Sequence, residues 1–250
     1  MDDEKKASVL EHLRELRRRL LWSAIAVIVT SSVCFAFIDR IFALLKRPAG
    51  DVNFIFIEMT EGFSVYMRVS IIAGIAVAMP FLIYQFLMFV LPALTSRERR
   101  MVFTVLPVVT LMFAGGVVFG YQYLVPPAAR FLLSFGAEAA NPQIRLSNYV
   151  DFVTRLLMAI GILFEMPVVT SFLARMGLIT SKWLADRRRI MIILAFVIAA
   201  FITPTPDAVN QSIVAGTMIV LYEMSIWAAR LVQKRRQTTE VLAEPEITEP

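Results

Sequence analysis

The chain has 250 residues; 58% of them are hydrophobic, 18% are charged, and the mean hydropathy is +0.69. A soluble domain of this length cannot hide so much apolar surface from water, so the composition indicates an integral membrane protein. We interpret the formal net charge of +5 as a topological signal and an attraction to anionic lipid, and draw no nucleic-acid inference from it.

Six apolar segments follow one another along the chain and predict an all-α protein with six transmembrane helices. A helix needs about 20 residues, at about 1.5 Å each, to cross a hydrocarbon core of about 30 Å. The predicted spans cover about residues 20–38, 69–90, 101–125, 152–174, 190–202 and 212–230. The last two are expected to be short. Because the fifth has only thirteen apolar residues, we expect local thinning of the bilayer beside it.

The basic residues predict the orientation of these spans. Eighteen of the 25 Lys and Arg residues lie before the first span, after the even-numbered spans, or in the C-terminal tail. The positive-inside rule therefore places both termini in the cytoplasm. The first span is expected to stay in the membrane, because its apolar core is longer than that of a cleaved signal peptide.

The domain organisation is predicted to be simple. No Gly/Ser linker, low-complexity block or internal repeat divides the chain, so residues 1–236 are expected to form a single polytopic membrane domain. Residues 237–250, "QTTEVLAEPEITEP", are expected to form a disordered cytoplasmic tail because of their acids and prolines. The segment "DRIFALLKRP" after the first span has apolar residues at helical spacing and predicts a surface helix.

An acidic residue, Glu165, interrupts the fourth apolar segment within "GILFEMPVV". It lies ten residues from Arg155 and ten from Arg175, which predicts a position near the bilayer midplane. Insertion of an acid at that depth costs about 2.5–3.5 kcal/mol, so such residues normally face a protein interior or a wet cavity and serve a function. In the alternative interpretation, a protonated Glu165 hydrogen-bonds a backbone carbonyl such as that of Leu163, which Pro167 leaves without its helical donor.

The residues needed for common enzymatic sites are missing. His12 is the only histidine and Cys34 the only cysteine, so neither a histidine-based metal site nor a catalytic Ser/His or Cys/His pair is predicted. The candidate acids Asp151, Asp186 and Asp207 all lie near segment ends, which argues against an intramembrane aspartyl dyad. We therefore expect no enzyme, no metal and no cofactor.

Two further stretches combine charge with apolar or aromatic residues on the side predicted to be cytoplasmic. In "VLEHLRELRRRL", apolar residues follow one side of a helix, and Glu15 stands four residues before Arg19. In "YQFLMFVLPALTSRERR", an aromatic-rich segment ends in a basic cluster that contains Glu98. On pattern alone, each acid is also explained as a local partner for neighbouring arginines.

Four motifs occur in order: "HLRELRRRL" before the first span, "YQFLMFVLPALTSRERR" between the second and third, "GILFEMPVV" in the fourth, and "ITPTPDAVNQ" between the fifth and sixth. In this order they resemble the TatC subunit of the twin-arginine protein translocase, and the resemblance covers essentially the whole chain. It implies a concave receptor in the bacterial cytoplasmic (inner) membrane that recognises folded cargo proteins whose signal peptides carry consecutive arginines.

The resemblance also implies which residues bind the signal peptide. By position in the motifs, Glu15 and Glu98 correspond to carboxylates that meet the two arginines, and Arg17 and Phe89 belong to the same cytoplasmic surface. The chemistry is suitable, because a carboxylate accepts two hydrogen bonds from the planar guanidinium group, which lysine cannot offer.

Partner subunits are implied as well. The resemblance assigns Glu165 as a polar anchor for the transmembrane helices of TatA- and TatB-type single-span subunits, with Thr203, Asp207 and Gln211 as a polar cluster for docking. Their alternative role is helix capping and turn formation. Self-association in a receptor complex, contact with membrane lipid, and energy from the proton motive force are further implications.

A different class of membrane protein also uses an acid within the membrane. An ion-coupled secondary transporter would combine Glu165 with proline-interrupted helices and loose small-residue packing such as Gly116 to Gly120. The chain lacks inverted repeats and a second broken helix with a complementary ion site. A transporter would bind a small solute at the midplane, whereas a receptor would bind a peptide at the cytoplasmic surface.

Overall fold

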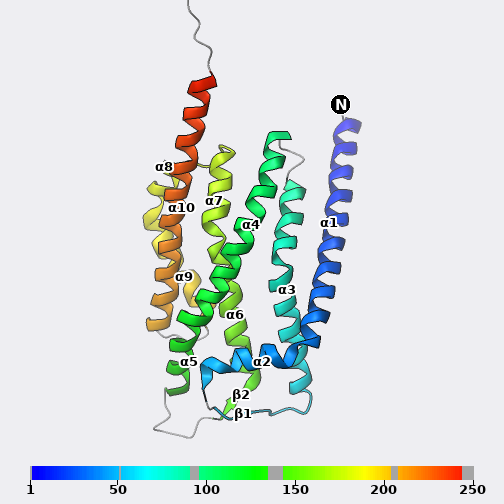
Figure 1. The fold of residues 1–250 in the computed structure, drawn as a ribbon, viewed down its shortest axis with the longest axis vertical. Coiled ribbons are helices and arrows are strands. Elements are labelled where there is room, and N and C mark those ends of the chain that lie inside the picture. Colours follow the sequence, from blue (N-terminus) through cyan, green and yellow to red (C-terminus); the bar gives the residue numbers. More distant parts are fainter. Residues whose placement is uncertain (1, 51, 91–95, 135–142, 204–207, 244–250) are drawn as a thin grey trace, which may run out of the picture.

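A computed structural model describes residues 2–50, 52–90, 96–134, 143–203 and 208–243. The described chain is almost entirely helical, with its long helices side by side along one axis (Figure 1), which confirms the expected all-α class. Within these ranges, five helical stretches are long and apolar enough to cross a membrane. They are His12–Ala36, Glu61–Phe89, Val105–Leu132, Leu146–Arg175 and Ala208–Gln233.

The first two long helices, α1 (Asp2–Ala36) and α3 (Glu61–Val90), pack against each other at one edge of the bundle (Figure 1). The hydroxyl of Thr30 donates to the carbonyl of Gly74 across this interface at 2.8 Å. A Cβ atom on Gly74 would lie 2.6 Å from the Cα of Ser31. The close approach of α1 and α3 therefore requires glycine at this position.

A short amphipathic helix, α2 (Ile38–Lys46), and a 3-10 turn, η1 (Arg47–Ala49), lie across one end of the bundle (Figure 1). The sequence predicted this surface helix, and the structure confirms it. Its buried side chains are Ile38, Phe42 and Leu45. The hydroxyl of Tyr121 donates to the carbonyl of Leu44 at 2.8 Å, and that of Tyr149 donates to the next carbonyl at 2.9 Å. These two bonds fix the C-terminal turn of α2 to the bundle.

Two strands, β1 (Phe54–Ile55) and β2 (Ile144–Arg145), pair in parallel below α2, with Phe54 opposite Ile144. From β2, the Arg145 Nε donates to Glu61 at 2.7 Å, and its Nη2 donates to Glu58 at 3.0 Å. These carboxylates, Glu61 foremost, raise the pKa of Arg145 above its ordinary value. The strand pair and the arginine together join the start of α3 to the start of α6.

The centre of the bundle contains α4 (Ser96–Phe119), a π-helical turn (η3, Gly120–Leu124), α5 (Val125–Ser134) and α6 (Leu146–Phe164). Two glycines bring α4 and α6 together. A Cβ atom on Gly116 would lie 2.8 Å from the Cβ of Phe164, and one on Gly161 would lie 2.7 Å from the ring of Phe113. No larger residue fits at either position without a shift of the helices.

The last third of the chain contains α7 (Met166–Arg175), α8 (Ser181–Asp186), α9 (Arg188–Ile202) and α10 (Ala208–Ala243). The fifth predicted span corresponds to α9, which has only 15 residues. This length, about 22 Å, does not cover a hydrocarbon core of about 30 Å.

The expectation of a short last helix is wrong, because α10 has 36 residues. Residues 237–243 are helical and not disordered, whereas residues 244–250 lie outside the described chain. The physical reason is local. After Gly216 the sequence contains no glycine or proline before Pro245, and its Lys, Arg, Glu, Leu and Ala residues favour the continuation of the helix.

The largest buried cluster lies where α3, α6, α9 and α10 meet, beneath α2 and α5. Among its fully buried members are Val69, Val150, Val153, Ala195, Ala199, Ala215 and Met218. Many large apolar side chains point outward instead, among them Trp22, Ile28, Ile193, Phe201 and Trp227. Exposed apolar side chains on long helices are typical of a protein whose solvent is lipid.

Candidate functional site

The N-terminal part of α1 meets the far end of α3 through an aromatic contact. The rings of His12 and Phe89 stack with centroids 4.5 Å apart and planes inclined by 22°. Phe89 is half-buried, whereas Arg17 is exposed on α1. The structure therefore places the predicted residue Phe89 against α1, next to the only histidine of the chain.

A second contact between α1 and α3 includes the predicted residue Glu15. Arg19 donates two hydrogen bonds to the Oε1 of Glu15, from Nε at 3.1 Å and from Nη2 at 2.8 Å. Its third donor, Nη1, reaches the buried amide oxygen of Gln85 on α3 at 3.0 Å. Glu15 is thus held by an arginine that is itself attached to the neighbouring helix, while no described residue donates to its Oε2.

Not every predicted residue of this surface is placed by the structure. Glu98 lies in the first turn of α4, but its side chain is outside the described part of the chain. The local pairing of Glu15 with Arg19, which the sequence offered as the alternative explanation of this acid, is present in the structure. Two side chains that the sequence did not indicate also belong to the described surface: His12 and Gln85. The spacing of His12, Glu15 and Arg19 at i, i+3 and i+7 could have placed them on one helical face, but the partner helix could not be read from the sequence.

Replacing Gln85 with methionine is expected to loosen the N-terminal part of α1. Methionine preserves the length of the side chain and removes the acceptor for Arg19; a hydrogen bond to a charged group contributes about 1.5–3 kcal/mol. Hydrogen exchange of the α1 amides near Glu15 should become faster. Gln122→Met, which changes an exposed glutamine elsewhere, is the control. Unchanged exchange in both variants would show that Gln85 does not anchor α1.

The fourth apolar stretch is broken at Glu165, which separates α6 from α7. The backbone N–H of Glu165 donates to Ile162 at 3.1 Å, and its carbonyl accepts from Val168 at 3.0 Å and Val169 at 2.9 Å. Pro167 follows in the first turn of α7 and supplies no N–H. The regular helix is therefore interrupted at the residue that carries the carboxyl group.

The Glu165 side chain is 7% exposed, and neither carboxylate oxygen has a hydrogen-bond partner among the described residues. The hydrogen bond to a backbone carbonyl that the alternative interpretation required is therefore not present in the described structure. A buried polar group without a partner is costly, which makes this one a candidate binding group.

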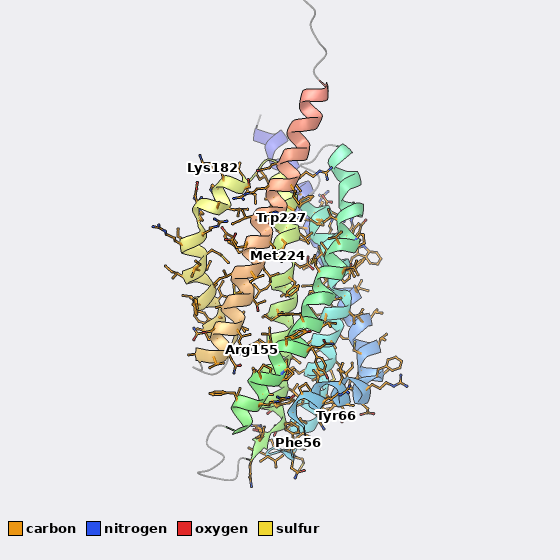
Figure 2. All side chains as sticks on the ribbon, turned by 60° about the vertical axis from the view of Figure 1, so that its left-hand side comes forward. Phe56, Tyr66, Arg155, Lys182, Met224 and Trp227 are labelled. Atoms are coloured by element: carbon orange, nitrogen blue, oxygen red, sulfur yellow. The ribbon has the colours of Figure 1, made fainter. Side chains whose placement is uncertain are left out.

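The depth expected for Glu165 is not supported by the helix bounds. The continuous apolar stretch runs over Leu146–Arg175, so Glu165 lies about 7 Å from its middle, toward the end of α7. Arg155, the predicted edge of the segment, is an exposed residue inside this stretch (Figure 2). An ion pair between Asp151 and Arg68 of α3 explains why charges occur within the helix rather than at its end.

The predicted polar cluster lies around the turn between α9 and α10. Thr203 is buried and its hydroxyl donates to the carbonyl of Ala199 at 2.8 Å, while the Nε2 of Gln211 donates to the carbonyl of Phe196 at 3.1 Å. Both side chains therefore serve the ends of α9 and α10. Asp207 lies outside the described residues.

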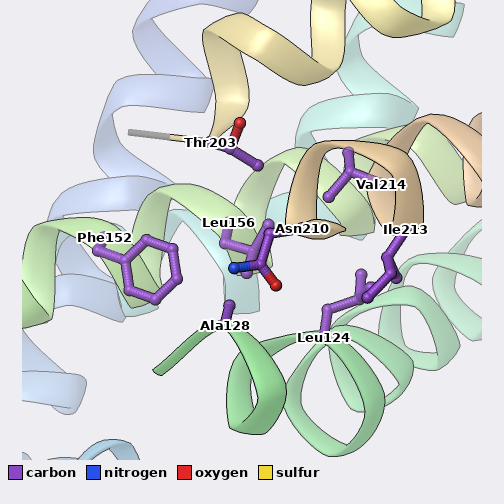
Figure 3. Close-up of a pocket in the computed structure, with 8 residues that line it drawn as sticks. All are labelled: Leu124, Ala128, Phe152, Leu156, Thr203, Asn210, Ile213 and Val214. Atoms are coloured by element: carbon purple, nitrogen blue, oxygen red, sulfur yellow. The ribbon is translucent and has the colours of Figure 1, made fainter. Parts of the chain in front are cut away.

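Thr203 and Asn210 line the same small cavity between α5, α6 and α10 (Figure 3). Its volume is about 10 Å³, close to that needed for one water molecule. Its other lining residues are Leu124, Ala128, Phe152, Leu156, Ile213 and Val214. The sequence did not indicate Asn210, a buried amide that shares this cavity with Thr203 and six apolar residues.

These observations define the class of the molecule: an all-helical integral membrane protein with one acid buried between its central helices and a charged, aromatic surface at one end. The chain belongs to the TatC family. The family model described as Sec-independent protein translocase protein (TatC) matches residues 11–216.

Curated relatives named Sec-independent protein translocase protein TatC agree over most of the chain. The protein of Koribacter versatilis (strain Ellin345) is 38% identical over 249 residues, covering 94% of this chain and 92% of its own length. That of Carboxydothermus hydrogenoformans is 32% identical and covers 95% and 99%. That of Campylobacter jejuni is 40% identical and covers 86% and 90%.

The fold is shared with two solved structures of TatC. A crystal structure described as the twin arginine translocase receptor TatC superposes with a TM-score of 0.78 at 37% identity, over 89% of this chain and 99% of that one. A second, determined in the detergent DDM, gives 0.79 at 38% identity over 87% and 99%. TatC proteins are components of a protein translocase and not enzymes, and the comparisons do not support the transporter interpretation of Glu165.

Proposed function

We propose that the chain is the receptor subunit of a twin-arginine translocase and binds consecutive-arginine signal peptides of folded proteins. The observation that carries the proposal is that only one of the two carboxylate oxygens of Glu15 accepts a hydrogen bond. Arg19 occupies its Oε1, and Oε2 accepts from no described residue. An incoming guanidinium group can therefore bind Oε2 without displacing Arg19.

The surroundings of Glu15 suit an arginine-rich peptide. Arg19 and Gln85 hold the carboxylate in place, which lowers the entropy lost on binding. The stacked rings of His12 and Phe89 offer an aromatic surface to the apolar part of a signal peptide. Glu98, at the start of α4, is proposed as the carboxylate for the second arginine, and Arg17 as part of the same surface.

The proposed topology has six spans, with α9 as the short fifth one, in a single membrane domain of residues 1–236. Figure 1 shows the start of α1 and the C-terminal end of α10 at the same end of the bundle, as an even number of spans requires. The excess of Lys and Arg at this end supports its placement in the cytoplasm and the location of the protein in the bacterial inner membrane.

Glu165 is proposed to anchor the transmembrane helices of TatA- and TatB-type subunits, with Thr203, Asp207 and Gln211 as a second docking region. The absence of a hydrogen-bond partner for the buried carboxyl group among the described residues supports the first assignment. A polar side chain of a partner helix would contribute about 1 kcal/mol there, which permits reversible assembly. Self-association and dependence on the proton motive force belong to the same proposal.

Binding of a labelled signal peptide to the purified protein tests the receptor function. A peptide with two consecutive arginines should bind the parent protein more tightly than the same peptide with two lysines. Glu15→Gln/Glu98→Gln should lose about tenfold in affinity for each carboxylate, because a hydrogen bond between charged groups contributes about 1.5–3 kcal/mol.

Glu165→Gln is the control, since Glu165 lies far from this surface and should not affect peptide binding. Equal affinity for the arginine and lysine peptides, or unchanged affinity in the double variant, would contradict the assignment of Glu15 and Glu98.

A further inference from the structure

The connection between α7 and α9, which includes the short helix α8, is firmly attached to α10. The hydroxyl of Tyr222 donates to the carbonyl of Leu184 at 2.8 Å. The amide oxygen of Gln233 accepts from both the N–H and the hydroxyl of Ser181, at 3.2 and 2.8 Å, and its Nε2 donates to Ile179 at 3.3 Å. Three hydrogen bonds from one glutamine and one from a tyrosine give this connection a fixed shape.

This rigid segment presents an aromatic ring and an arginine together at the surface. The Trp183 side chain is 45% exposed, and the Cζ of Arg187 lies 3.8 Å from the centroid of its ring. The N–H groups of Arg187 donate to no other described residue. Lys182, next to the tryptophan, lies at the outer edge of the bundle (Figure 2). A guanidinium group stacked on an indole keeps its N–H edge available for an anion.

The charges around this stack are mostly positive. Arg188 forms an ion pair with Glu223 of α10 at 2.7 Å, so it is neutralised locally. Arg189 is exposed and forms no ion pair with a described residue, and the exposed acids nearby are Asp186 and the already paired Glu223. Together with Lys182 and Arg187, the surface has an excess of positive charge that suits a phosphate group.

The apolar helix α9 begins directly after this surface in the sequence. From Ile190 onward, α9 exposes large apolar side chains, including Ile193, Phe196 and Val197. Tryptophan and basic residues directly before a lipid-facing helix are typical of the membrane interface, where the indole lies at headgroup level and the cations meet phosphates. The change from basic to apolar surface therefore favours lipid over a soluble acidic peptide.

We propose that Lys182, Trp183 and Arg187 form a binding site for the phosphate headgroup of an anionic phospholipid. A headgroup bound at this site would place the first residue of α9 at the level of the lipid phosphates. Because α9 is too short for the hydrocarbon core, the mismatch must then appear at its other end, beside Thr203. The resemblance to TatC implies contact with membrane lipid, and this site would be one place of that contact. The proposed lipid binding does not depend on signal-peptide binding.

Fluorescence of Trp183 in nanodiscs tests this site. The chain has three tryptophans, so Trp22→Phe/Trp227→Phe leaves Trp183 as the only one. Two nanodisc samples contain the same mixture of phosphatidylglycerol and phosphatidylcholine, with brominated, quenching chains on one lipid or the other. Each basic residue near an anionic membrane surface increases the affinity for that surface about fivefold. We therefore expect brominated phosphatidylglycerol to quench Trp183 more than an equal fraction of brominated phosphatidylcholine.

Two variants of the single-tryptophan protein provide the comparison. Lys182→Gln/Arg187→Gln should abolish the difference between the two lipids, whereas Lys46→Gln/Arg47→Gln, with the same loss of charge at the opposite end of the bundle, should retain it. Thermal unfolding of each variant shows whether it is folded.

Equal quenching by both lipids in the parent would overturn the proposal, even if the variants do not fold. So would a preference that persists in folded Lys182→Gln/Arg187→Gln. An acidic soluble peptide that shifts Trp183 emission without any lipid preference would assign the surface to a protein partner instead. None of these readouts uses a signal peptide, so a failure here leaves the receptor function untouched.

Discussion

Replacing Arg145 with glutamine is expected to lower the thermal unfolding midpoint far more than the same replacement of Arg68. The side chain of Glu61 is 2% exposed and accepts from Arg145 at 2.7 Å and from the N–H of Ile57 at 2.9 Å. Without the guanidinium group, this carboxylate remains enclosed with no cation beside it, which is strongly destabilising. The same change removes the bond to Glu58 and so loosens the connection between β2 and α3.

Arg68→Gln is the matched control. Arg68 also joins α3 to α6, through Asp151, but the two side chains are 48% and 35% exposed. Exposed ion pairs contribute at most about 1 kcal/mol. Differential scanning fluorimetry of both variants in the same detergent measures the contrast. Equal shifts of the midpoint would contradict the view that the bonds of Arg145 to Glu58 and Glu61 stabilise the end of the bundle that carries α2 and the two strands.

Two neighbouring glycines in α4 are expected to respond to alanine with opposite signs. Gly116 is buried against α6, where a Cβ atom would lie 2.8 Å from Phe164 and 3.0 Å from the Cα of Gly161. Because neither atom can move without the α6 backbone, we expect Gly116→Ala to lower stability by about 1–3 kcal/mol. Gly115 has nothing within 4 Å of its Cβ position. Gly115→Ala should therefore be neutral or stabilise by up to about 1 kcal/mol through helix propensity.

Unfolding of both alanine variants by heat or denaturant in detergent gives the comparison, and residue 115 serves as an internal control for residue 116. A loss of stability at both positions would mean that α4 needs glycine for its own backbone. A loss at neither would mean that α4 and α6 are less closely packed than the structure shows.

Much of the helical content could be predicted because it depends on local composition. The apolar runs identified the long helices, and the helical spacing of the apolar residues in "DRIFALLKRP" identified α2 as a surface helix. The length of α10 was missed because the acids and prolines of residues 237–250 indicate a disordered tail, although Lys, Arg, Glu, Leu and Ala residues continue from Arg230 to Glu244. Those residue types favour a helix whether or not lipid surrounds it. Hydropathy therefore located the apolar part of α10 but not its end.

The candidate sites could be predicted only in part, since they depend on contacts between helices. Glu15, Phe89 and Glu165 were recognised from motifs, but the role of Arg19 requires Gln85, which is 66 positions away in the sequence. The predicted depth of Glu165 depends on Arg155 as a boundary, but Arg155 lies inside the helical stretch Leu146–Arg175. The structure shows that α6 begins at Leu146, and that Asp151 within it pairs with Arg68 of α3. No local pattern contains this information.

The position of α1 has a mechanical consequence. Apart from its junction with α2, α1 packs mainly against α3, and none of its described residues belongs to the main buried cluster of the bundle. The helix is therefore held along one side only, by the contacts of Thr30, Arg19 and His12 with α3. A ligand that binds between the N-terminal turns of α1 and α3 can therefore displace α1 without disturbing the packing of the main buried cluster. We expect such a displacement to be passed on mainly to α3, the helix against which most of α1 packs.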